Sequence, residues 1–293
     1  MYCYFCNQNL YLHIFKPKTM ILVTKKYLKL ALILLFVAGT LTSQAQRRKR
    51  NAQPEVVAQP APFDSVKWRI EHYVVDRDSA NIDPRVALRK LIGGNRRFVE
   101  NKSIRPRQDA AALRGTSSTQ KPYAVIVGCS DSRVPNEIIF DQGVGDLFIV
   151  RTAGQVMAAA SYGSIEFATV ALKSKFILVL GHQKCGAVDA AVKRPENPPG
   201  HIVTLINAIK PAVQKVRAMG GDILAHAVRQ NVIEQVNELR DLEPVLSKMY
   251  HDGEILIVGG VYDLTTGKVE FLPETLKDLP VIKITKNNAK SDH

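Results

Sequence analysis

The sequence predicts an α/β fold: a mostly parallel four-stranded sheet with an added edge strand and helices on both faces. Short, predominantly apolar segments support this prediction, because strands that are buried on both faces have this composition. The four segments are 123–128, 147–150, 176–180 and 254–258. Helix-like stretches separate them, as expected for a parallel sheet. In such sheets the functional site lies beyond the carboxyl ends of the strands.

Helical patterns precede and separate these strands. Pro84 suits a first helical turn, and apolar residues then recur at roughly helical spacing up to Val99, although Gly93 and Gly94 interrupt the pattern. An edge strand is expected at 269–272. Further helices are expected around 136–141, at 161–173 and, as three segments, between 187 and 250.

The first 45 residues have the features of a signal peptide. They contain five lysines and no acidic residue, and an uncharged run of twelve residues covers 30–41. That run is too short to span a bilayer comfortably, and Ser43-Gln44-Ala45 fits a cleavage site. We therefore expect an exported, soluble periplasmic protein. The alternative is an uncleaved membrane anchor, because the basic residues 47–50 would hinder export.

The remaining chain divides into three parts. With 293 residues, 46% of them apolar, it can form one good-sized domain with extensions. Residues 46–83 begin as a linker rich in Gln, Ala and Pro and continue as an N-terminal arm. Residues 84–275 form the predicted main domain. Residues 276–293 are expected to be a flexible basic tail.

The positive charge lies mainly at the two ends of the chain. The formal net charge is +13, but five of the lysines belong to the leader. Removing them leaves 35 basic and 27 acidic residues, and further positive charges lie at 47–50 and in the tail. The main domain is therefore only mildly basic, and we expect no nucleic-acid partner.

Two cysteines and a histidine directly follow predicted strands. Cys129 follows the first strand, and His182 and Cys185 follow the third. Neighbouring parallel strands would bring the three together, and a Cys₂His set with an open fourth position is typical of catalytic zinc. Alternatives are cysteines that only fill the core, or a Cys129–Cys185 disulfide. A structural zinc would need a fourth protein ligand, and the main domain has no further cysteine.

Three motifs resemble those of the β-carbonic anhydrases. They are CSDSRVP at 129–135, GDLFIVRTAG at 145–154 and GHQKCGA at 181–187, within a resemblance that extends from about Leu88 to Leu272. The resemblance implies one Zn²⁺ per chain, held by the two cysteines and the histidine. It also implies reversible hydration of carbon dioxide to bicarbonate and a proton by zinc-bound hydroxide.

The resemblance implies roles for five further residues. Asp131 and Arg133 would form the family's Asp–Arg pair, in which Asp131 aims the hydroxide, and Asp131 could become a fourth zinc ligand in a closed state. Gln120 would hydrogen-bond bicarbonate, and Phe148 would line the carbon dioxide pocket. Phe167 stands where plant-type members carry a tyrosine, so it would line the pocket without a hydroxyl.

Members of this family form dimers, so the resemblance implies a homodimer or a dimer-based tetramer. Gln120 and Phe167 would then belong partly to the neighbouring subunit's pocket. The segment 63–75 is expected to form an arm that packs on the partner, because apolar residues recur in it at helical spacing. These residues are Val66, Ile70, Tyr73 and Val74.

Two other functions fit the same motifs. One is a related zinc hydrolase, for example one that acts on carbon disulfide, which would differ only in the access route to the metal. The other is a non-catalytic module that binds zinc or bicarbonate. The presence of both Asp131 and Arg133 argues against the second.

Overall fold

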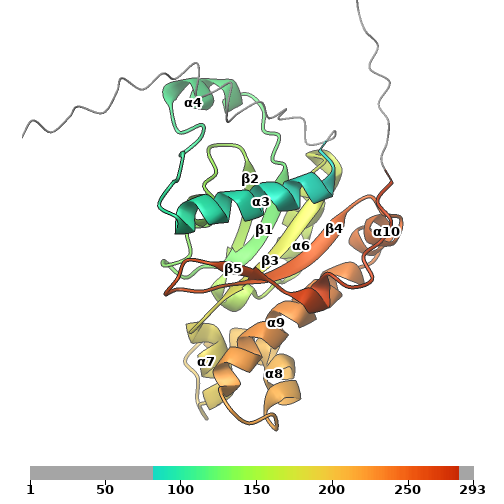
Figure 1. Cartoon of the computed structure of the whole chain (residues 1–293). Helices are drawn as coiled ribbons and strands as arrows, with labels where there is room; N and C mark the ends of the chain where they lie inside the picture. The colour runs from blue at the N-terminus through green and yellow to red at the C-terminus, as the bar shows by residue number, and fades with distance from the viewer. Residues whose placement is uncertain (1–81, 284–293) are drawn as a thin grey trace, which may run out of the picture. The chain divides into compact units, whose positions relative to one another are not determined.

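A five-stranded sheet forms the centre of the domain that the structure describes (Figure 1). The computed structural model describes residues 82–283, so the predicted leader, the arm at 63–75 and nearly all of the linker lie outside the described residues. The strand order is β2-β1-β3-β4-β5, with the first four parallel and β5 antiparallel to β4. The predicted four-stranded parallel sheet with an added edge strand is thus confirmed. The strands are β1 (Ala124–Cys129), β2 (Leu147–Thr152), β3 (Phe176–His182), β4 (Leu256–Tyr262) and β5 (Val269–Phe271).

Helices cover both faces of this sheet. One face packs on α3, through Ala87 and Leu91, and the other packs on α6, α9 and α10. The α-helices are α3 (Pro84–Val99), α4 (Ala110–Thr116), α5 (Asn136–Ile139), α6 (Ala159–Glu166), α7 (Gly186–Lys193), α8 (Ile202–Val216), α9 (Ile223–Arg240) and α10 (Leu246–His251). Three shorter helical segments are η1 (Ala153–Gln155), the π-helix η2 (Phe167–Ala171) and η3 (Pro273–Thr275).

The first described helix differs from its predicted form. Asp83 caps it by accepting a hydrogen bond from the Arg85 N–H, and Pro84 occupies its first turn, as expected. The expected interruption at Gly93 and Gly94 is wrong, because α3 is continuous through both. A Cβ on Gly94 would lie 1.8 Å from the Phe140 carbonyl oxygen, so this glycine permits a close approach to the end of α5.

Other boundaries also differ. Helix α4 was not predicted, and four helices rather than three follow residue 185. Strand β4 begins two residues later and ends four residues later than the predicted segment 254–258.

The start of the expected flexible tail packs on the core. Leu276, Leu279 and Ile282 contact the apolar cluster on the α3 side of the sheet, and the Lys283 N–H donates to the Gly253 carbonyl. The packed domain therefore extends beyond 275. Within 82–283, no helix has the length and apolar character needed to cross a membrane.

Candidate metal centre

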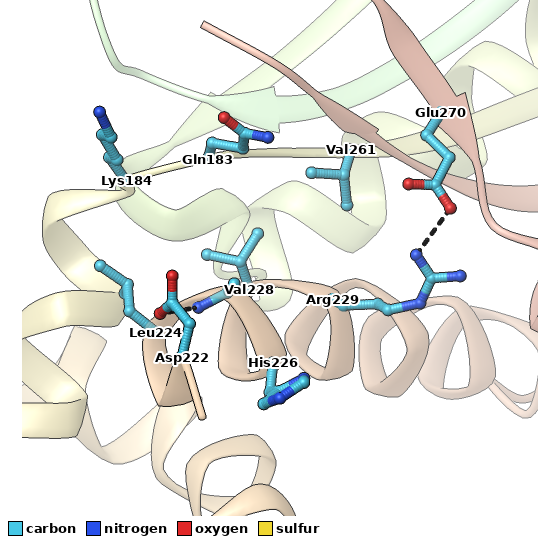
Figure 2. Close-up of a pocket in the computed structure, with 10 residues that line it drawn as sticks. Gln183, Lys184, Asp222, Leu224, His226, Val228, Arg229, Val261 and Glu270 are labelled. Atoms are coloured by element: carbon cyan, nitrogen blue, oxygen red, sulfur yellow. Dashed lines mark hydrogen bonds and ion pairs between the residues drawn. The ribbon is translucent and has the colours of Figure 1, made fainter. Parts of the chain in front are cut away.

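A cavity of about 350 Å³ lies beside the start of α9 (Figure 2). Gln183 and Lys184 from the loop after β3 line one side of it. Two of its polar side chains are already engaged: Asp222 accepts from the Ala225 N–H, and Arg229 forms an ion pair with Glu270 at 2.8 Å. None of the site residues predicted from the sequence lines this cavity. It is therefore a neighbour of the candidate site and not the site itself.

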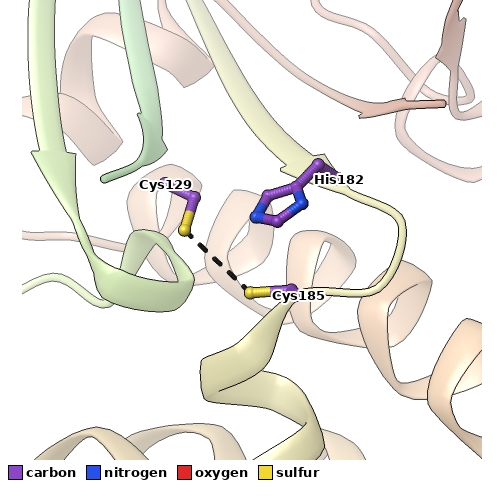
Figure 3. Close-up of side chains that lie close together, drawn as sticks. All are labelled: Cys129, His182 and Cys185. Atoms are coloured by element: carbon purple, nitrogen blue, oxygen red, sulfur yellow. Dashed lines mark hydrogen bonds between the residues drawn. The ribbon is translucent and has the colours of Figure 1, made fainter. Parts of the chain in front are cut away.

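The three predicted ligands lie together at the carboxyl edge of the sheet (Figure 3). Cys129 ends β1, His182 ends β3, and Cys185 directly precedes α7. Their ligand atoms all lie within 4.8 Å of one another, and all three residues are buried. Adjacent parallel strands thus bring together residues that are 53 and 56 positions apart.

The spacing of the two sulfurs fits a metal ion. They are 4.0 Å apart and both cysteines are free, whereas a disulfide needs about 2.05 Å. Two thiolates at about 2.3 Å from a tetrahedral zinc would lie roughly 3.8 Å apart. The alternative of a Cys129–Cys185 disulfide does not match this geometry.

The His182 ring presents a free nitrogen to the two sulfurs. Its Nδ1 lies 2.9 Å from the Gln183 carbonyl oxygen, an acceptor, which assigns the proton to Nδ1. The side chain is fully buried, and Nε2 has no hydrogen-bond partner in the described chain. Because an unpartnered buried nitrogen is costly, a metal ion at Nε2 would complete the arrangement.

The surroundings of Cys129 favour a thiolate. Its pKa lies well below the usual range, mainly because the Cys185 thiol donates to its sulfur. Backbone N–H groups contribute as well, and that of Gly154 lies 3.2 Å from Cys129 Sγ. The pKa of Cys185 is raised, first by this shared proton and then by burial. A divalent cation would take the place of the proton that the two sulfurs share.

Asp131 and Arg133 form a bidentate ion pair beside this cluster. Arg133 donates from Nε to Asp131 Oδ1 at 2.9 Å and from Nη2 to Oδ2 at 2.8 Å. This pairing holds the pKa of Asp131 well below its usual value. Asp131 Oδ2 faces the cluster at 3.7 Å from His182 Nε2, which is too far for a hydrogen bond. Both carboxylate oxygens are thus engaged by Arg133.

Sequence reasoning missed Arg151. This residue of β2 donates from Nε to the Cys129 carbonyl at 2.9 Å and from Nη2 to the Asp131 carbonyl at 2.8 Å. It therefore fixes the backbone between Cys129, the candidate ligand, and Asp131. The signal was a charged residue near the end of an otherwise apolar strand, inside one of the three motifs.

The other predicted site residues lie apart from the cluster. Gln120 is exposed in the loop before β1. Cys129 is the last of the six residues of β1, so it lies about 16 Å from the end of the strand at which Gln120 is located. Phe148, near the start of β2, packs against Phe167, with ring centroids 6.4 Å apart. Half of Phe167 is exposed (51%). These three residues do not complete a pocket around their own chain's cluster.

Comparisons with known proteins agree with this fold and centre. Residues 124–269 match the family model described as carbonic anhydrase. Carbonic anhydrase from Mycolicibacterium smegmatis is 39% identical over 193 residues, which cover 65% of this chain and 94% of the relative. Carbonic anhydrase 2 from Mycobacterium tuberculosis is 40% identical over 191 residues, covering 64% and 92%. The chain therefore belongs to the carbonic anhydrase family.

Solved structures specify the class. The β-carbonic anhydrase CcaA superposes with a TM-score of 0.52 at 28% identity, covering 66% of this chain and 98% of that one. A Coccomyxa β-carbonic anhydrase gives 0.51 at 25% identity, covering 63% and 86%. The protein is thus an enzyme of the β class of carbonic anhydrases.

Proposed function

We propose that the protein hydrates carbon dioxide reversibly with one Zn²⁺ per chain, held by Cys129, His182 and Cys185. The main support is the cluster itself: three buried ligand atoms within 4.8 Å, two of them sulfurs spaced as around a tetrahedral metal. The unpartnered His182 Nε2 is the third ligand atom. When bound, zinc supplies a Lewis acid that makes a water molecule acidic near pH 7.

In this proposal Asp131 orients the nucleophile. Its Oδ2 faces the cluster and would accept a hydrogen bond from the water or hydroxide bound there, which would orient that nucleophile toward carbon dioxide. Arg133 keeps the carboxylate ionised and fixed by two parallel hydrogen bonds. Arg151 holds the carbonyl of Asp131 and so fixes the backbone from which this side chain extends.

We further propose a homodimer, or a tetramer built from dimers, in which each subunit completes the other's pocket. Gln120 and the Phe148–Phe167 pair would bind bicarbonate and carbon dioxide at the partner's cluster. Two observations support this. Gln120 lies at the opposite end of β1 from Cys129, and Phe167 and Val170 on η2 expose apolar side chains (51% and 46%) that a partner would cover.

Metal analysis of the ligand variants tests this function. Wild-type protein should contain close to one zinc per chain, whereas Cys185→Ser should retain little, because a hydroxyl is a poor zinc ligand. Ser174→Ala is the matched control. It removes a buried hydroxyl that donates to the Pro122 carbonyl, and the variant should keep its zinc.

Assays with carbon dioxide and with carbon disulfide distinguish a carbonic anhydrase from the rival hydrolase. Bound zinc without turnover of either substrate would favour the non-catalytic module.

Export remains a proposal that rests on the leader at 1–45, which lies outside the described residues. Fractionation of cells that carry a C-terminally tagged chain, with N-terminal sequencing, tests it. Soluble periplasmic protein that begins near residue 46 is expected. Full-length protein in the cytoplasm would contradict export, and full-length protein in the membrane fraction would support the uncleaved anchor.

A further inference from the structure

A chain of hydrogen bonds connects helix α9 to the sulfur of Cys129. Asn231 Nδ2 donates to the Gly154 carbonyl at 3.1 Å, and Gln235 Nε2 approaches the same oxygen at 3.4 Å. The N–H of Gly154 in turn donates to Cys129 Sγ at 3.2 Å. Gly154 of η1 thus accepts a hydrogen bond from α9 through its carbonyl and donates one through its N–H to Cys129, the candidate zinc ligand.

The backbone at this point needs support from its neighbours. Gly154 has φ +65° and ψ +20°, and Gln155 also has a positive φ of 46°. Two successive left-handed residues, one of them not a glycine, persist only where surrounding contacts hold them. A Cβ on Gly154 would lie 2.8 Å from Ile209 Cδ1 and 3.0 Å from Ala187 Cβ, so the turn also packs tightly against α7 and α8.

The two amides occupy unusual positions on α9. Asn231 and Gln235 are 2% and 6% exposed, on a helix whose neighbouring residues Val232 and Val236 belong to the apolar core. They are four residues apart, on one face of the helix, and Gln235 Nε2 also lies 3.4 Å from Asn231 Oδ1. Buried amides cost free energy unless they are paired, and the partner that they share is the Gly154 carbonyl.

We propose that Asn231 and Gln235 are positioning residues for the metal centre: they hold Gly154 so that its N–H remains directed at Cys129 Sγ. An N–H donor stabilises the negative charge of a thiolate and reduces the electron density that the sulfur donates to a metal. The inference rests on the proposed zinc function. A purely structural role would satisfy the buried carbonyl but would leave the sulfur–metal bond unchanged.

The test uses full-length protein with Zn²⁺ and with Co²⁺, whose charge-transfer band reports on the sulfur ligands. Asn231→Leu removes the donor while keeping the same branched arrangement of side-chain heavy atoms, and Asn237→Leu, at an exposed position of the same helix, is the control. We expect Asn231→Leu to bind Zn²⁺ about tenfold more weakly in chelator competition, because Cys129 would lose a contact that stabilises its thiolate form and holds its position. Its cobalt band should move to longer wavelength, while the control matches wild type.

Folded Asn231→Leu with wild-type zinc affinity and an unshifted band would overturn the inference, as would an equal shift in Asn237→Leu. If Asn231→Leu does not fold, Gln235→Met decides the question. A band shift in that variant supports the positioning role, and an unchanged band contradicts it. Failure of the wild-type protein to bind zinc or cobalt would instead refute the proposed function itself.

Discussion

Replacing Asp131 by asparagine changes the candidate site by a single functional group. The carboxylate accepts three hydrogen bonds from Arg133: the backbone N–H and Nε donate to Oδ1, both at 2.9 Å, and Nη2 donates to Oδ2 at 2.8 Å. An amide has one acceptor oxygen, and its NH₂ group would face a guanidinium donor. Asp131→Asn therefore loses the bidentate pairing and the acceptor that faces His182.

The size of the effect follows from the role proposed for Oδ2. Removing one positioned hydrogen-bonding group at a reacting centre lowers kcat by about 10²–10³-fold, or about 2.7–4 kcal/mol. We expect a fall of at least about 100-fold in carbon dioxide hydration. Zinc content should not change, because Cys129, His182 and Cys185 are untouched.

Stopped-flow measurement of carbon dioxide hydration, with zinc determined on the same sample, is the assay. Asp252→Asn is the matched control: this carboxylate pairs with Lys248 at 2.6 Å on the surface and has no contact with the cluster. The control should hydrate carbon dioxide at the wild-type rate. If zinc-loaded Asp131→Asn also hydrated carbon dioxide at the wild-type rate, the role assigned to Asp131 would be refuted.

Three further predictions test other parts of the structure. Gly94→Ala should destabilise the fold by about 3 kcal/mol, because its Cβ would meet the Phe140 carbonyl oxygen. Gly93→Ala, whose Cβ would have only a contact at 3.8 Å, should instead be neutral or stabilising by up to about 1 kcal/mol, and urea unfolding compares the two. Burial lowers the pKa of Lys90 from 10.5 to about 8, so the charged lysine costs stability below pH 8. Lys90→Met should therefore raise Tm at pH 7, and this gain should shrink between pH 8 and 10.5. Phe167→Arg should weaken the proposed dimer and its activity together, and an unchanged mass by light scattering would contradict that interface.

The sheet and the cluster of Cys129, His182 and Cys185 could be predicted because their signals are local. Each of the central strands is a short apolar run, and β1 and β3 are buried along their whole length. Cys129 and His182 stand at the ends of those runs. Parallel pairing alone then brings them together, without information about any loop.

Contacts between distant parts of the chain could not be predicted in the same way. Gly94 looks like a helix breaker until its approach to Phe140 is known. Asn231 and Gly154 are 77 positions apart, and the amide sits in an apolar helical stripe where nothing local indicates its partner. The expected tail was assigned by its lysines, although Leu279 and Ile282 pack on the core.

The most direct test of the central claim is carbon dioxide hydration by purified protein before chelation, after chelation and after zinc is restored. We predict close to one zinc per chain at the start, loss of activity in step with loss of zinc, and recovery on adding Zn²⁺ back. Activity that persists in zinc-free protein would contradict the account, as would a zinc-loaded protein that hydrates no carbon dioxide.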